Sequence, residues 1–167
     1  MSQSRAAHPH LPTVVERLTV FLRGQPYLEP AAPIVATPED LAHVLDALGH
    51  HIVALTLVAR SDDNILDQER RVIFRYSVQR AAKLGHPLSD GEKQALEEYL
   101  EDFYPPLAML EDALERLKFD SKADLEALLE AAHDVIGADH IYRIDEVSFL
   151  LSLRHDLASI AGPDAGL

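Results

Sequence analysis

The stretch VARSDDNILDQE at residues 58–69 joins two apolar segments through a short acidic turn, and VIGADHIYRIDE at residues 135–146 repeats its pattern. Asp62 and Asp139 are 77 residues apart, and so are Glu69 and Glu146. In both copies an Asp marks the turn and a Glu follows seven residues later, at the start of the next apolar segment. A turn repeated between apolar segments of helical periodicity predicts an all-helical fold.

Apolar residues recur at helical spacing on both sides of these turns and in most of the remaining chain. The sequence predicts seven helical segments, at about 12–23, 37–60, 67–84, 90–103, from Pro106 to about 118, 122–136 and 144–161. Helix-start signals support several of them, including Thr37 before Pro38 and the capping box of Ser89 with Glu92. Residues 141–144 have strand character but are too few for a sheet. The predicted fold class is all-α, a compact bundle of about seven helices with an internal helix-turn-helix repeat.

The chain has 167 residues, a length that suits one domain with a short arm. We expect a disordered leader at 1–11, an N-terminal helix and a proline-rich connection at 12–36, the helical domain at 37–162 and a frayed tail at 163–167.

The chain carries 28 acidic and 15 basic residues, for a net charge of -13. Such a chain repels nucleic-acid phosphates and anionic lipids, so cations and basic proteins are the expected partners. The absence of Cys excludes disulfides and thiolate metal sites and fits a reducing compartment. The N-terminus has no secretory signal, and apolar stretches such as residues 52–59 fall short of a membrane span. We therefore expect a cytoplasmic protein without a membrane span.

The carboxylates of the two turns are the candidate metal ligands: Asp62, Glu69, Asp139 and Glu146. On one continuous helix, an Asp and a Glu seven residues apart would stand about 10 Å apart, whereas a turn between them lets the side chains converge. Carboxylate oxygens favour Ca²⁺ or Mg²⁺. The fifth position of each loop is Leu66 or Arg143, so neither loop is an EF-hand.

A structural alternative explains the same four residues without a ligand. Each Asp would accept a hydrogen bond from turn backbone, and each Glu would accept one from an amide at a helix start. Both interpretations remain open at the level of sequence.

The repeated pattern of an apolar helix, Ala or Ser before Asp, an Ile in the turn and a Glu before the next helix resembles the TerB family of tellurite-resistance proteins. The resemblance covers roughly residues 37–161 and includes the closing segment FLLSLRHDL at residues 149–157. It implies an all-helical domain associated with tellurite and stress resistance, with cation binding proposed at the acidic turns. The family Gly after each Asp is Asp63 in one copy and His140 in the other. Gly at this position serves a backbone with positive φ, which Asp and His tolerate better than most residues.

Other features of the sequence suggest fewer functions. His50 and His51 are adjacent and are expected on different helix faces, so that only one of them could join His133 or His140 at a metal. No phosphate loop, nucleophile elbow or His-Glu-x-x-His element is present, and we expect a non-enzyme; a hydrolase with a carboxylate-bound metal is the remaining enzymatic alternative. Acidic residues between 89 and 130 predict a solvated face or a docking surface for a basic partner: Glu92, Glu97, Glu98, Glu101, Asp102, Glu111, Asp112, Glu115, Glu126 and Glu130.

Overall fold

The computed structural model describes residues 41–62 and 64–161, and this part of the chain is helical without strands. It contains six α-helices and one short 3₁₀ helix: α2 (Ala42–Ala59), η2 (Arg60–Asp62), α3 (Asp67–Lys83), α4 (Asp90–Asp102), α5 (Met109–Leu117), α6 (Lys122–Ile136) and α7 (Ile144–Ala161). The predicted all-α class is confirmed, and each of the six α-helices corresponds to a segment predicted from the sequence. The predicted leader at 1–11, the helix at 12–23, its connection to residue 36, the cap at Thr37 and the tail at 163–167 lie outside the described residues.

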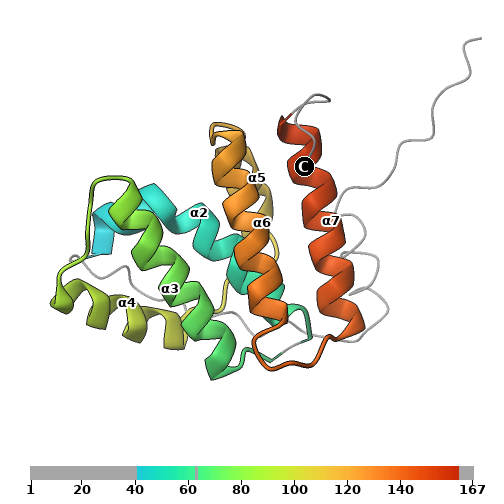
Figure 1. The fold of residues 1–167 in the computed structure, drawn as a ribbon, viewed down its shortest axis with the longest axis horizontal. Coiled ribbons are helices and arrows are strands. Elements are labelled where there is room, and N and C mark those ends of the chain that lie inside the picture. Colours follow the sequence, from blue (N-terminus) through green and yellow to red (C-terminus); the bar gives the residue numbers. More distant parts are fainter. Residues whose placement is uncertain (1–40, 63, 162–167) are drawn as a thin grey trace, which may run out of the picture.

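Helix α2 lies at the centre of the bundle and packs against α3, α5, α6 and α7 (Figure 1). Its second half, from His51 to Ala59, is buried at every position. Helices α6 and α7 lie side by side, α3 packs on α6, and α4 packs on α3 (Figure 1). Because α2 is covered on several sides, its apolar residues occupy all faces of the helix rather than one stripe.

Helix α2 is also relevant to the expectation that the chain has no membrane span. Residues Ala42–Asp62 form a helical stretch long and apolar enough to cross a membrane, with a mean hydropathy of 1.4. By length and composition alone α2 thus resembles a spanning helix, although its uninterrupted apolar run at residues 52–59 is short, and the expected absence of a membrane span stays a prediction. In the structure 61% of the longer stretch is buried among the other helices, as is usual for the core helix of a bundle.

Local hydrogen bonds explain where several helices begin. Ser89 accepts a hydrogen bond from the Glu92 amide at 3.3 Å, and the Glu92 carboxylate accepts one from the Ser89 amide at 2.7 Å, which is the predicted capping box of α4. Ser121 caps α6 in the same way through the Asp124 amide. Gly85, with φ of 87°, follows the end of α3.

Replacing Ser89 with Ala should lower the free energy of unfolding by about 1 kcal/mol, because one amide at the start of α4 loses its partner. Urea unfolding of the two proteins measures the difference. Ser148→Ala, an exposed change past the first turn of α7, is the control and should have a smaller effect. An unchanged midpoint for Ser89→Ala would show that solvent replaces the cap.

Candidate functional site

Both acidic turns are held by the same backbone hydrogen bond. Asp62 Oδ1 accepts one from the Asn64 amide at 3.1 Å, and Asp139 Oδ1 accepts one from the Ile141 amide at 2.8 Å. In each case the carboxylate bonds the amide two residues later, which tightens the turn.

Each Glu caps the helix that follows its turn. Glu69 accepts a hydrogen bond from the Leu66 amide at 2.6 Å at the start of α3. Glu146 accepts one from the Arg143 amide at 3.1 Å at the start of α7. The local hydrogen bonds of the structural alternative are therefore present for both Asp and both Glu residues.

The fold also brings the two turns together, because η2 packs against α7. Arg143 links them: its guanidinium forms an ion pair with Asp62 of the first turn and lies 3.9 Å from Asp139 of its own turn. Both Asp side chains are largely buried, whereas Arg143 is 38% exposed. The two turns thus lie next to each other, with an arginine between Asp62 and Asp139.

The two Glu side chains are buried next to each other, at 2% and 3% exposure for Glu69 and Glu146. Burial raises the pKa of Glu69 to about 7; the Leu66 amide opposes this rise, and the charges of Glu146 and Asp139 add to it. Burial also raises the pKa of Glu146, against the lowering effects of the Arg143 amide and guanidinium and a hydrogen bond from Glu69. With a pKa of about 7, Glu69 is partly protonated at neutral pH.

Backbone geometry agrees with the expectation for the residue after the second Asp. His140 has φ of 63°, in the left-handed region where Gly is favoured. Among the described residues, no other residue except Gly has a positive φ. Its counterpart Asp63 lies outside the described residues.

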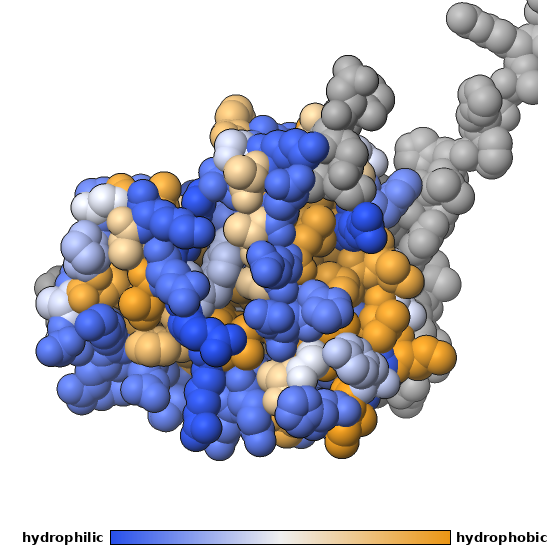
Figure 2. Space-filling model, in the orientation of Figure 1, coloured by the Kyte–Doolittle hydropathy of each residue, from blue (hydrophilic) through white to orange (hydrophobic). Residues whose placement is uncertain are grey.

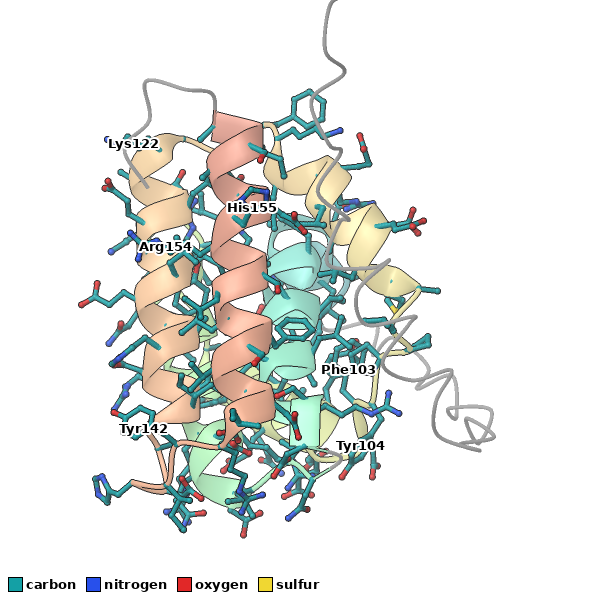
Figure 3. The ribbon with its side chains drawn as sticks, turned by 90° about the vertical axis from the view of Figure 1, so that its right-hand side faces the viewer. Phe103, Tyr104, Lys122, Tyr142, Arg154 and His155 are labelled. Carbon is teal, nitrogen blue, oxygen red and sulfur yellow. The ribbon has the colours of Figure 1, made fainter. Side chains whose placement is uncertain are left out.

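The turns differ in two respects that the sequence pattern did not reveal. Ile65 is buried, whereas Tyr142 at the equivalent position is exposed at the end of the bundle (Figure 3). Arg143, which replaces the acid of a calcium loop, is the main positive charge of the site. The sequence showed only that Arg143 occupies the position equivalent to Leu66 in the repeat. It did not show that the Arg143 side chain would reach Asp62.

The four carboxylates are neighbours without forming a closed coordination shell. Within the described residues, one group of His, Asp and Glu places ligand atoms within 4.8 Å of one another, and it is His50, His51 and Asp120 rather than the turns. Binding an ion at the turns therefore requires the Arg143 side chain to move and the carboxylates to close in.

The expectation for the adjacent histidines is wrong. His50 and His51 both reach Asp120, with Nε2 atoms 3.6 and 2.6 Å from Asp120 Oδ2, because this carboxylate lies beside α2 between the two ring directions. Burial lowers the pKa of His51 to about 4 and lowers that of His50 as well. His133 instead lies next to the Tyr142 ring, 6.3 Å away between centroids.

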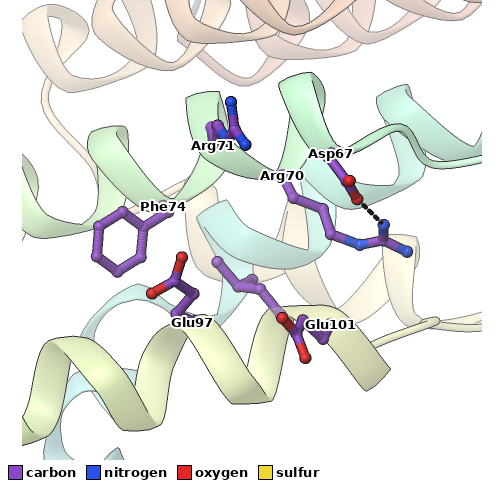
Figure 4. A pocket seen from close by; sticks show the side chains of 7 residues that line it. Asp67, Arg70, Arg71, Phe74, Glu97 and Glu101 are labelled. Atoms are coloured by element: carbon purple, nitrogen blue, oxygen red, sulfur yellow. Dashed lines mark hydrogen bonds and ion pairs between the residues drawn. The ribbon is translucent and has the colours of Figure 1, made fainter.

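A groove of about 180 Å³ between α3 and α4 begins close to the first turn (Figure 4). Arg70 and Arg71 of α3 and Glu97 and Glu101 of α4 line it, and Arg70 donates a hydrogen bond to Asp67 at 3.2 Å. Because both signs of charge line this groove, it has no strong preference for a cation or an anion.

Comparison of the chain with protein-family models, with curated proteins and with solved structures finds no match in any of the three.

Proposed function

We propose that this chain is a non-enzymatic, cytoplasmic, TerB-like stress-response module whose paired acidic turns bind Ca²⁺ or Mg²⁺. The observation that carries the proposal is the excess of negative charge where the turns meet. One arginine pairs with two aspartates, and the buried Glu69 and Glu146 lie close by; burial raises the pKa of Glu69 to about 7, so that this carboxyl is partly protonated at neutral pH.

The equivalent hydrogen bonds of the two turns support the proposed internal repeat. The hydrogen bonds accepted by Asp62 and Glu69 recur 77 residues later at Asp139 and Glu146, with the same carboxylate oxygens and equivalent backbone amides. A cation entering between the turns displaces the Arg143 guanidinium from both Asp residues and the proton that Glu69 partly retains at neutral pH. Because it competes with an internal cation, we expect weak binding, on the order of 0.1–1 mM.

Calcium titration followed by amide NMR tests this proposal. Shifts should concentrate at residues 62–69 and 139–146 and saturate, and calorimetry at pH 7 in two buffers of different ionisation heat should detect proton release from the Glu pair. Asp62→Asn with Asp139→Asn should abolish both signals, whereas Asp102→Asn, an exposed change on α4, should leave them intact. No localised shift up to roughly 10 mM, ten times the weak limit of such sites, would exclude the ion site.

A second function is favoured by a different observation, namely that Arg143 already pairs with Asp62 and lies close to Asp139. In this alternative the turns are structural and the chain is an interaction module for a basic protein. Its docking surface would be the exposed carboxylates on α4 and α5, among them Glu97, Glu98 and Glu101.

The structure also exposes apolar side chains, at the opposite end of the bundle from α4 (Figure 1). They gather at the second turn and on α7, where Figure 2 shows orange side chains over α7, and comprise Ile141, Tyr142, Ile144 and Leu151. The test is binding of a defined basic peptide, which should weaken with salt and be lost when Glu97, Glu98 and Glu101 are all changed to Gln. Binding that is insensitive to salt and to this triple change would exclude the acidic surface.

A further inference from the structure

A compact cluster of ligand atoms lies away from the acidic turns, where the middle of α2 meets the α5–α6 turn. His51 is 1% exposed, and its two ring nitrogens lie 2.6 Å from Tyr76 Oη and 2.6 Å from Asp120 Oδ2. The His50 ring lies 4.5 Å from the His51 ring, between centroids, at an angle of 67°. Two imidazoles from adjacent residues therefore reach one carboxylate.

His50 is a buried polar side chain without a hydrogen-bond partner. Its side chain is 10% exposed, and neither ring nitrogen donates or accepts a hydrogen bond. Nε2 lies 3.6 Å from Asp120 Oδ2, too far for a hydrogen bond. An orphaned imidazole of this kind costs free energy unless something else binds it. The ring also lines a pocket of about 280 Å³ between α2, α4 and α5, which offers a path for an ion and a water molecule.

We propose that His50 Nε2, His51 Nε2 and the Asp120 carboxylate form a binding site for a divalent transition metal, with Zn²⁺ as the best-fitting ion. One ligand atom from each of the three residues lies within 4.8 Å of the other two, and the two Nε2 atoms are 3.6 and 2.6 Å from Asp120 Oδ2. Two imidazoles and one carboxylate are a typical zinc donor set, and three protein ligands leave the fourth position to water. In a tetrahedral site with bonds of about 2.0–2.1 Å, ligand atoms lie about 3.3 Å apart, so the cluster needs only small adjustments.

The hydrogen bonds of His51 specify how the metal enters. Without metal, the Asp120 carboxylate can only accept, so His51 Nε2–H donates to it and Nδ1 accepts from the Tyr76 hydroxyl. With metal, Nε2 becomes the ligand and the ring proton lies on Nδ1, from which it is donated to Tyr76 Oη. One proton leaves Nε2 and one is gained at Nδ1, so His51 stays neutral. Tyr76 then orients the ligand, as outer-shell partners of metal-bound His do.

Two arginines near the cluster must be considered, because positive charge opposes metal binding. Arg80 forms an ion pair with Asp124, which takes up its charge. Arg116 is largely exposed, with Asp46 4.0 Å away, so solvent screens it. The cluster therefore keeps the Asp120 charge available for a metal.

Zinc titration of the full chain in competition with a chromophoric chelator tests the site. One Zn²⁺ per chain should bind at this site. His50→Ala should weaken zinc binding by about 100-fold or more, since even loss of an outer-shell partner costs 10–100-fold. Tyr76→Phe should weaken binding by about 10-fold. His155→Ala, an exposed change on α7 whose position Figure 3 shows, should have no effect.

Two further measurements separate this site from a purely structural cluster and from the acidic turns. Histidine-ring ¹⁵N NMR should show the His51 proton moving from Nε2 to Nδ1 when Zn²⁺ is added. Asp139→Asn should leave zinc affinity unchanged, so that this site and the proposed calcium site succeed or fail separately. His50→Ala should stay folded by circular dichroism, because its ring makes no hydrogen bond. Equal zinc affinity of wild type and His50→Ala, or an unchanged His51 tautomer, would overturn the proposal.

Discussion

Exchanging Glu69 for Gln should make the protein more stable than wild type at pH 8, by about 3 kcal/mol, and leave it nearly unchanged at pH 4.5. The folded-state pKa of Glu69 is about 7, against an ordinary value of 4.5, mainly because the carboxyl is buried. A raised acid pKa means that the folded protein binds the proton more tightly than the unfolded chain does. Stability is therefore lost as the pH rises from about 4.5 through 7.

Gln reproduces the protonated form of Glu69, since it is neutral and its side-chain oxygen can still accept the Leu66 amide hydrogen bond. The stability difference between variant and wild type should therefore grow with pH and level off above 8. Urea unfolding at pH 4.5, 6, 7 and 8 measures it. Glu97→Gln, an exposed change on α4, is the control and should give a difference that varies little with pH.

Wild type must be compared with the variant, because His51 changes the free energy of unfolding with pH in the opposite direction to Glu69. Burial lowers the pKa of His51 to about 4, so the folded protein binds fewer protons than the unfolded chain between pH 4 and 6.5. That contribution increases stability as the pH rises, and it partly cancels the Glu69 effect in wild type. A constant difference between Glu69→Gln and wild type from pH 4.5 to 8 would show that folding does not raise the pKa of Glu69.

Replacing Arg143 with Gln should lower the free energy of unfolding by about 2 kcal/mol without added metal. Removal of one partner of a buried ion pair costs 3–5 kcal/mol, and the partial exposure of Arg143 reduces this. Asp62 and Asp139 would then repel each other and the Glu pair. Thermal unfolding at neutral pH measures the loss, and Arg154→Gln, an exposed change on α7, should cost little (Figure 3).

The same variant also separates the two candidate functions. If the turns bind Ca²⁺, loss of the competing guanidinium should raise calcium affinity by about 10-fold, which corresponds to about 1.4 kcal/mol of binding free energy. Added calcium should then restore the melting temperature of the variant. If the turns are purely structural, calcium should leave Arg143→Gln as unstable as before. A variant as stable as wild type without metal would contradict the role assigned to Arg143.

Local features were predictable because their causes lie within a few residues. The capping box of Ser89 and Glu92, the start of α6 after Ser121 and the positive φ of His140 follow from side-chain chemistry and backbone sterics at those positions. Six helices follow from periodicity and from these signals. The hydrogen bonds at Asp62, Glu69, Asp139 and Glu146 were also accessible, since each spans two or three residues.

The sequence by itself thus determined the helices, their caps and the two acidic turns. Only the tertiary structure decided what those turns and histidines contact, because α2, α6 and α7 must pack before residues far apart in the chain can meet. Arg143 pairs with Asp62 across more than half of the described chain, and His51 bonds Asp120 at a separation of 69 residues. No local pattern encodes such contacts, since they depend on the relative positions of packed helices and on which buried polar groups need partners.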